Sequence, residues 1–249
     1  MVAAVNTAAP TPGPRRSFIH RVLQQAGARF ERIGDGLIAM EYDRPDDEIA
    51  QARRMGIADL SILPRTGFKG TGTVEWLTTQ GLKIGADSNI AYRQSGGELA
   101  ARLAPTEIYL VDSLAAGGRL TAQLNGAWAW TAERPRKLIG YPMPRAESHA
   151  WFAVTGEKSP AMFAKICGVD LRPPHFANGR IAQTSLAKMS GIIVRADLGR
   201  TPAYYVLADS ASAEYLWGCL MDAMEEFSGA PVGLLALRQL AGEGEETSR

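Results

Sequence analysis

GFKGTGTVEWL, residues 67–77, has the pattern of a strand that ends in a glycine turn and opens a helix. FAVTGEKSPAMF, residues 152–163, repeats that pattern later in the chain. Each copy is followed by an apolar strand that runs into Asp-Ser and then a further helix, IYLVDS at 108–113 and YYVLADS at 204–210. Internal repetition of this kind predicts two similar α+β halves packed around one core.

The repeat also suggests how the chain is divided. We expect a disordered arm over 1–16, a domain over 17–240 and a disordered acidic tail over 241–249. Within the domain, the two halves cover about 17–132 and 145–240. The stretch between them is rich in proline and charged residues and is expected to be a linker.

Apolar spacing predicts the elements of each half. In the first half these are helices over 17–26, 46–55, 74–80 and 120–130, a hairpin over 29–40, strand character over 57–68 broken at Pro64, and strands over 99–103 and 108–111. In the second half they are strands over 151–154, 181–186, 191–196 and 204–208 and helices over 159–166, 212–227 and 232–240. The helix at 212–227 has the clearest helical period in the chain.

Composition excludes several functional classes. The chain has 249 residues, 46% hydrophobic and 21% charged, with a net charge of +1. This balance predicts neither nucleic-acid nor anionic-lipid binding by bulk charge. Neither a membrane-length apolar run nor a signal-peptide core is visible, and Cys167 and Cys219 lie among apolar neighbours as buried thiols do. We therefore expect a cytoplasmic protein with reduced cysteines.

No catalytic or metal-binding motif emerges from the residues themselves. Gly67, Gly70 and Gly72 fit neither phosphate-loop pattern and are expected to form an ordinary turn. GxSxG, CxxC and HExxH are absent, and the three histidines are widely separated. Trp128 and Trp130, followed by basic residues at 134, 136 and 137, are expected to be half-buried core or, as the alternative, a protein interface.

The order of these segments resembles the folate-binding domain of the glycine-cleavage T-protein, an aminomethyltransferase. The similar segments are 17–30, 49–82 with GIADLS at 56–61, 151–171, and FSGAPVGLLALR at 227–238. Within that superfamily the chain is most similar to the gamma subunit of heterotetrameric sarcosine oxidase and related N-methyl amino-acid dehydrogenases. AQTSLAK at 182–188 and DSASAEYLW at 209–217 carry this likeness. The resemblance implies duplicated ferredoxin-like α/β halves without the transferase's C-terminal β-barrel.

Two departures from the transferase pattern separate these relatives. The resemblance implies a carboxylate after the first helix of the repeat, yet TTQGLK at 78–83 has none, and Asp87 is the nearest candidate. It also implies a glutamate in the folate loop of the second half, where DLGRTPA at 197–203 is shorter and has none. Loss of such carboxylates would remove proton transfer and electrostatic stabilisation from the site.

We therefore expect a non-catalytic subunit of a flavin-dependent oxidoreductase that demethylates sarcosine or a similar secondary amine. The resemblance implies no catalytic, cofactor or metal-binding residues in this chain. FAD, FMN, NAD and tetrahydrofolate would belong to partner subunits, namely large alpha and beta flavoproteins and a small zinc-type delta subunit. If so, Trp128, Trp130 and Trp217 are the candidate anchors of the partner face.

Two alternatives remain open at this point. A stand-alone tetrahydrofolate-dependent aminomethyl- or methyltransferase would need Asp87 to supply the missing carboxylate. A regulatory assembly factor with the same fold would, like the subunit, need no active-site residues.

Overall fold

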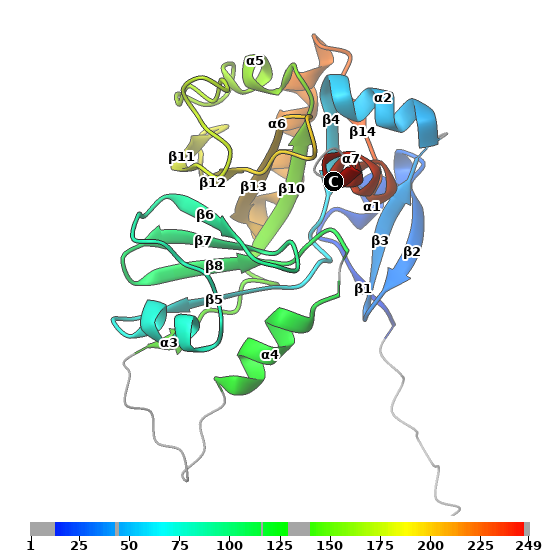
Figure 1. The fold of residues 1–249 in the computed structure, drawn as a ribbon. Helices are drawn as coiled ribbons and strands as arrows, with labels where there is room; N and C mark the ends of the chain where they lie inside the picture. Colours follow the sequence, from blue (N-terminus) through cyan, green and yellow to red (C-terminus); the bar gives the residue numbers. More distant parts are fainter. Residues whose placement is uncertain (1–12, 43–44, 116, 129–139, 247–249) are drawn as a thin grey trace, which may run out of the picture.

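The computed structural model describes residues 13–42, 45–115, 117–128 and 140–246. Within these ranges the chain is a mixed α+β protein with a six-stranded, a five-stranded and a three-stranded sheet (Figure 1). This confirms the predicted α+β class. No helix of the described chain is long and apolar enough to cross a membrane.

The six-stranded sheet has the order β11-β12-β13-β10-β4-β14. Its strands are β4 (Gly56–Asp59), β10 (His149–Thr155), β11 (Ile181–Leu186), β12 (Met189–Arg195), β13 (Ala203–Asp209) and β14 (Ala230–Pro231). All neighbours pair antiparallel except β14 and β4, which are parallel. Central strands of the sheet are buried on both faces, so β10 and β13 are nearly continuous apolar runs.

The five-stranded sheet has the order β6-β7-β8-β5-β9 and is antiparallel throughout. Its strands are β5 (Arg65–Lys69), β6 (Ile90–Arg93), β7 (Leu99–Ala104), β8 (Glu107–Val111) and β9 (Tyr141–Pro142). The three-stranded sheet joins β1 (Arg15–Arg16), β3 (Gly36–Glu41) and β2 (Arg29–Ile33). The hairpin expected over 29–40 is therefore confirmed as β2 and β3.

Seven α-helices pack against the sheets in the described chain. They are α1 (His20–Gln25), α2 (Pro45–Met55), α3 (Thr73–Thr79), α4 (Arg119–Ala127), α5 (Ser159–Phe163), α6 (Ala213–Glu225) and α7 (Leu234–Glu246). One apolar cluster joins α5 and α6 to the six-stranded sheet, and another joins α3 and α4 to the five-stranded sheet. Alternate residues of each strand thus face a helix layer or the other sheet.

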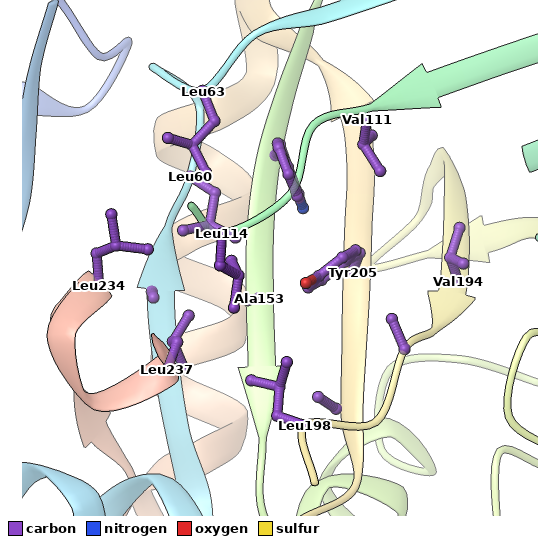
Figure 2. Packing of buried hydrophobic residues seen from close by; sticks show 14 of the residues in the cluster. Leu60, Leu63, Val111, Leu114, Ala153, Val194, Leu198, Tyr205, Leu234 and Leu237 are labelled. Atoms are coloured by element: carbon purple, nitrogen blue, oxygen red, sulfur yellow. The ribbon is translucent and has the colours of Figure 1, made fainter. Parts of the chain in front are cut away.

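The main core lies between the two larger sheets. Tyr109 and Val111 of β8 meet Trp151 of β10 and Tyr205 of β13 there, and Leu234 and Leu237 of α7 close one side of it. Figure 2 shows Leu114, Ala153, Leu198 and Tyr205 around this space. Burying each large apolar side chain contributes roughly 1.5–3 kcal/mol, so this shared core holds the sheets together.

The sheets are also connected at one edge. The Ala91 N–H donates to the Gly179 carbonyl at 2.7 Å, and the Ile181 N–H donates to the Asn89 carbonyl at 2.9 Å. These bonds join β6 to the start of β11. An edge strand that is paired in this way presents no free template for aggregation.

The strand orders β6-β7-β8-β5 and β11-β12-β13-β10 follow the same plan. In each, the first strand in sequence is followed by a helix and then by a three-strand meander, with a further helix after it. The succession of strand, helix, apolar strand and helix in the repeated sequence pattern is therefore present in both sheets, with β6 as an additional strand that the sequence did not predict.

Several boundaries differ from the prediction. The interrupted strand at 57–68 is two strands, because Pro64 lies where the chain leaves the six-stranded sheet for the five-stranded one. Arg15 and Arg16 form β1 within the expected arm, and β9 lies within the expected linker. Helix α7 ends at Glu246, whereas we expected a helix ending at 240 and a disordered tail.

Candidate functional site

A cavity of about 710 Å³ lies beside the inter-sheet core. Its walls come from the turn between β6 and β7, the residues after β8, the loop between β12 and β13, and α7. The polar side chains that line it are Arg93, Ser113, Asn178, Asp197, Tyr205 and Arg238. Its volume is that of a site for a small molecule, and polar side chains make up a large part of its lining.

Tyr205 contributes the buried hydroxyl of the cavity. Strand alternation directs Tyr204 toward the α5/α6 layer and Tyr205 toward the sheet interface. The Tyr205 ring packs edge-on against Trp151 with centroids 5.1 Å apart, and Figure 2 shows it pointing into the space bordered by Ala153 and Leu198. Burial raises the pKa of Tyr205 to about 12, although nearby Arg93 opposes the shift. The hydroxyl is therefore a donor at neutral pH, and within the described residues it has no hydrogen-bond partner.

Asp197 is the carboxylate among the described residues that line the cavity. The Arg195 guanidinium donates to both of its oxygens, at 2.9 and 2.7 Å. The side chains of Arg195 and Asp197 are only 9% and 17% exposed. The Ala203 N–H also donates to Asp197 at 3.3 Å. Because both oxygens are engaged, Asp197 holds the β12–β13 loop in place and is poorly suited to accept a proton from a substrate.

Two arginines give the cavity a positive rim. Arg238 of α7 donates from Nε to the Leu114 carbonyl at 2.7 Å and from Nη2 to the Ala115 carbonyl at 3.3 Å. Arg93 is exposed at the end of β6, and its guanidinium forms no hydrogen bond or ion pair with any residue of the described ranges. Since Arg195 offsets Asp197, the net charge is positive. The arrangement suits a planar or apolar molecule that carries an acidic group.

The structure does not place Asp87 in this cavity. Asp87 is exposed, and its backbone N–H and carbonyl are both bonded to the Tyr92 hydroxyl, at 3.1 and 2.9 Å. By contrast, the 197–203 loop, which is shorter than the resemblance implies, still reaches the cavity through Asp197, Leu198 and Gly199. Sequence reasoning missed Arg93, Tyr205 and Arg238 because they come from separate elements that only the tertiary fold brings together.

Two of the three candidate partner anchors are buried, so the interface alternative is wrong for Trp128 and Trp217, while the core expectation for Trp128 is confirmed. Trp128 is 4% exposed and packs edge-on against Trp76, with ring centroids 4.3 Å apart. Trp217 is also 4% exposed and packs against Phe152. Both fill helix–sheet interfaces, where a large amphipathic ring removes the most apolar surface from water. Trp130 and the basic residues 134, 136 and 137 lie outside the described residues.

The cysteines and other titratable groups form no second centre. Cys167 is buried, Cys219 is half-buried, and both are free thiols. In the parts of the chain that the structure describes, no group of three or more His, Cys, Asp and Glu side chains could hold a metal ion.

Comparisons with known proteins place this arrangement among solved folds. No protein-family model matches the sequence, and a search of curated proteins finds no match either. A chain of heterotetrameric sarcosine oxidase from Corynebacterium sp. U-96, in complex with pyrrole 2-carboxylate, is similar in structure, with a TM-score of 0.61 and 21% identity. The match covers 88% of this chain and 98% of that one. The glycine cleavage system aminomethyltransferase T from Bartonella henselae matches with a TM-score of 0.66 and 18% identity.

The chain has the fold of these two proteins. It spans 62% of the aminomethyltransferase chain, while 91% of this chain is matched. The resemblance to sarcosine oxidase and to the T-protein is thereby confirmed at the level of the fold. No β-barrel of the transferase type appears among the strands that the described residues form.

Proposed function

We propose that this chain is a non-catalytic, gamma-type subunit of a flavin-dependent heterotetrameric sarcosine oxidase or a related N-methyl amino-acid dehydrogenase. The complex would oxidise the C–N bond of a secondary amine at a flavin and pass the one-carbon unit to tetrahydrofolate. The observation that carries the proposal is the 98% coverage of the matched sarcosine oxidase chain. That chain contains little beyond the matched fold, so this fold alone suffices for a subunit of such a complex.

The chemistry of the cavity supports a role without catalysis. Its described lining offers one carboxylate, Asp197, and Arg195 occupies both oxygens of that group. A general acid or base needs a lone pair or proton that is available to the substrate.

We assign no cofactor to this chain. FAD, FMN, NAD and tetrahydrofolate would be held by large alpha and beta subunits, beside a small zinc-type delta subunit, in the cytoplasm. The shared strand order supports an origin of the two halves by duplication of a ferredoxin-like unit.

Purification of the chain from its native host tests the subunit proposal. A tagged chain is expected to elute with larger subunits in constant ratio and with flavin absorption in the blue region. A colourless, solitary chain under the same gentle conditions would contradict the proposal.

A second candidate, a stand-alone tetrahydrofolate-dependent transferase, is favoured by one feature, the cavity with a positive rim. Tetrahydrofolate carries a planar ring system and acidic groups, so the isolated chain should bind it if this candidate is correct. Calorimetric titration of the wild type, Arg93→Gln and Asp87→Asn tests it. Binding that Arg93→Gln weakens and Asp87→Asn leaves unchanged would support the cavity as the site. Binding abolished by Asp87→Asn would instead favour the segment at 80–89, between α3 and β6.

A further inference from the structure

The outward side of α6 carries features that destabilise a free helix. We define the outer α6 face as Glu214, Tyr215, Gly218, Asp222 and Glu225, all of which are exposed. The opposite side of the helix packs Leu216, Leu220 and Met224 onto the six-stranded sheet. Local rules that a sequence breaks without an evident gain often mark functional surfaces.

Gly218 lies in the middle of α6 with no packing reason to be glycine. A Cβ built at Gly218 would meet nothing within 4 Å in the described structure. Glycine in a helix interior is less stable than alanine because it loses more backbone freedom on folding. Glycine at this position would, however, allow the backbone of a second polypeptide to approach the helix closely.

The charges on this face are all acidic and unpaired. Glu214, Asp222 and Glu225 form no ion pair with the described residues, whereas neighbouring Glu226 binds Lys165 at 3.2 Å. The last turn of α6 has no basic residue. Asp222 and Glu225 therefore lie near the negative end of the helix dipole and repel each other across one turn. A cationic surface placed over them would offset both effects.

Tyr215 adds an aromatic side chain to the same face. It is 54% exposed, and its hydroxyl donates to the Ala187 carbonyl at 3.0 Å, which links α6 to the turn between β11 and β12. The Tyr215 ring is thus held in one orientation before any partner arrives. Tyrosine is enriched among the residues that carry most of the binding energy at protein interfaces.

We propose that the outer α6 face docks a lysine- or arginine-rich segment of a larger partner subunit, whose backbone approaches α6 at Gly218. The identity of the partner as a subunit of the complex rests on the proposed function. Carboxylates on both sides of Gly218 attract a basic polypeptide and repel nucleic-acid or lipid phosphates. Docking would pair the acidic residues, cover Tyr215 and use the space that the missing side chain leaves.

The test compares flavin content per mole of tagged chain after purification from the native host. Asp222→Lys/Glu225→Lys should lower this ratio at least tenfold, and sodium chloride should dissociate the wild-type complex progressively. Glu31→Lys/Glu75→Lys is the matched control, because it changes the same number of exposed charges on β2 and α3. The control should retain the wild-type ratio.

Two glycine-to-alanine variants distinguish an effect on complex formation from an effect on the stability of the chain. Gly218→Ala should raise the melting temperature of the isolated chain by about 2–4 °C yet weaken the complex. Gly126→Ala on α4, also exposed with nothing within 4 Å of its Cβ, should leave the complex intact. A reversed α6 face or Gly218→Ala that keeps full flavin content would overturn the docking site while leaving the subunit proposal standing. A wild-type chain that carries no flavoprotein would overturn both.

Discussion

Arginine side chains have opposite roles at two places near the sheet interface. Arg65 is 3% exposed and donates from Nη1 to the Ser61 and Leu63 carbonyls and from Nη2 to those of Ala146 and His149. These carbonyls belong to the two segments that pass between the six-stranded and five-stranded sheets, so Arg65 fastens both crossings. Arg93, at the rim of the cavity, forms no such bonds with the described residues.

This difference shows what decides the role of an arginine. A buried guanidinium with many internal hydrogen bonds stabilises the fold, whereas an exposed one without such bonds can bind a ligand. At the Arg65 junction, four carbonyl oxygens accept from the two terminal nitrogens of the guanidinium, and only its buried Nε–H has no partner among the described residues. At the cavity, Arg195 and Asp197 bind each other through two hydrogen bonds, whereas Arg93 and the Tyr205 hydroxyl have no partner among the described residues and can meet a ligand. Substitutions at these positions should therefore differ strongly in their effect on stability.

Replacing Arg65 with methionine should be the most damaging change. It leaves several buried carbonyls without donors at both sheet crossings, and we expect a loss of about 3 kcal/mol or more in the free energy of unfolding. Arg93→Met, the exposed counterpart, should change stability by less than about 0.5 kcal/mol. Urea unfolding of both variants provides the measurement. Similar losses of unfolding free energy for the two variants would contradict the idea that Arg65 stabilises the fold and Arg93 does not.

Arg195→Met should cost about 2–3 kcal/mol, because it leaves the Asp197 carboxylate partly buried without its partner. Arg195 also donates to the Phe176 carbonyl at 2.6 Å, and that bond is lost as well. Adding Asp197→Asn to this variant should recover part of the loss, since the unpaired charge is then removed. The comparison again uses urea unfolding. If the double variant is no more stable than Arg195→Met, the ion pair is not what holds the loop.

The Arg65 junction should also affect stability through pH. Burial lowers the pKa of His149 to about 4, and the charges of Arg145 and Arg65 add to the shift. A lowered histidine pKa stabilises the fold above the unfolded value of 6.5, and the benefit is lost as the pH falls toward 4. Because His149 is partly exposed, solvent screening reduces this to about 1–2 kcal/mol.

His149→Gln supplies the control for that pH effect. Its unfolding free energy should fall less than that of the wild type between pH 6.5 and 4. Burial raises the pKa of Asp59, which works in the opposite direction in both proteins and cancels in the difference. Parallel pH profiles for the two proteins would show that His149 is not the titrating group.

Adjacent tyrosines on β13 should give the smallest contrast. Tyr204 donates to the Leu171 carbonyl at 2.7 Å, so Tyr204→Phe should cost about 1 kcal/mol. The Tyr205 hydroxyl faces the cavity without a partner among the described residues, so Tyr205→Phe should be neutral within about 0.5 kcal/mol. Thermal unfolding of the pair tests this. A loss for Tyr205→Phe equal to that for Tyr204→Phe would mean that its hydroxyl supports the fold.

Much of the fold could be predicted from the sequence because apolar periodicity is local information. Strand β11 (Ile181–Leu186) matches its predicted bounds, and α6 (Ala213–Glu225) lies within the predicted helix at 212–227. Strand β6 (Ile90–Arg93) was missed, since its four half-exposed or exposed residues show no apolar alternation, although it pairs with β7 across the short turn at 94–98.

The candidate site was harder to predict than the strands. Arg93, Tyr205 and Arg238 are far apart in sequence and match no motif, and only the packing of β6, β13 and α7 brings them to one cavity. Trp217 and, in the interface alternative, Trp128 were wrongly named as candidate partner anchors for a different reason. A tryptophan on an amphipathic helix can face core or partner, and its depth depends on where the neighbouring sheet lies.

The most direct test of the account is a spectroscopic comparison of the native complex with the isolated chain. Sarcosine, or the related secondary amine that the complex uses, is mixed anaerobically with each, and the flavin band and tetrahydrofolate turnover are followed. We predict bleaching of the flavin band in the complex and neither flavin nor turnover in the isolated chain. An isolated, colourless chain that itself transfers a one-carbon unit to tetrahydrofolate would contradict the account.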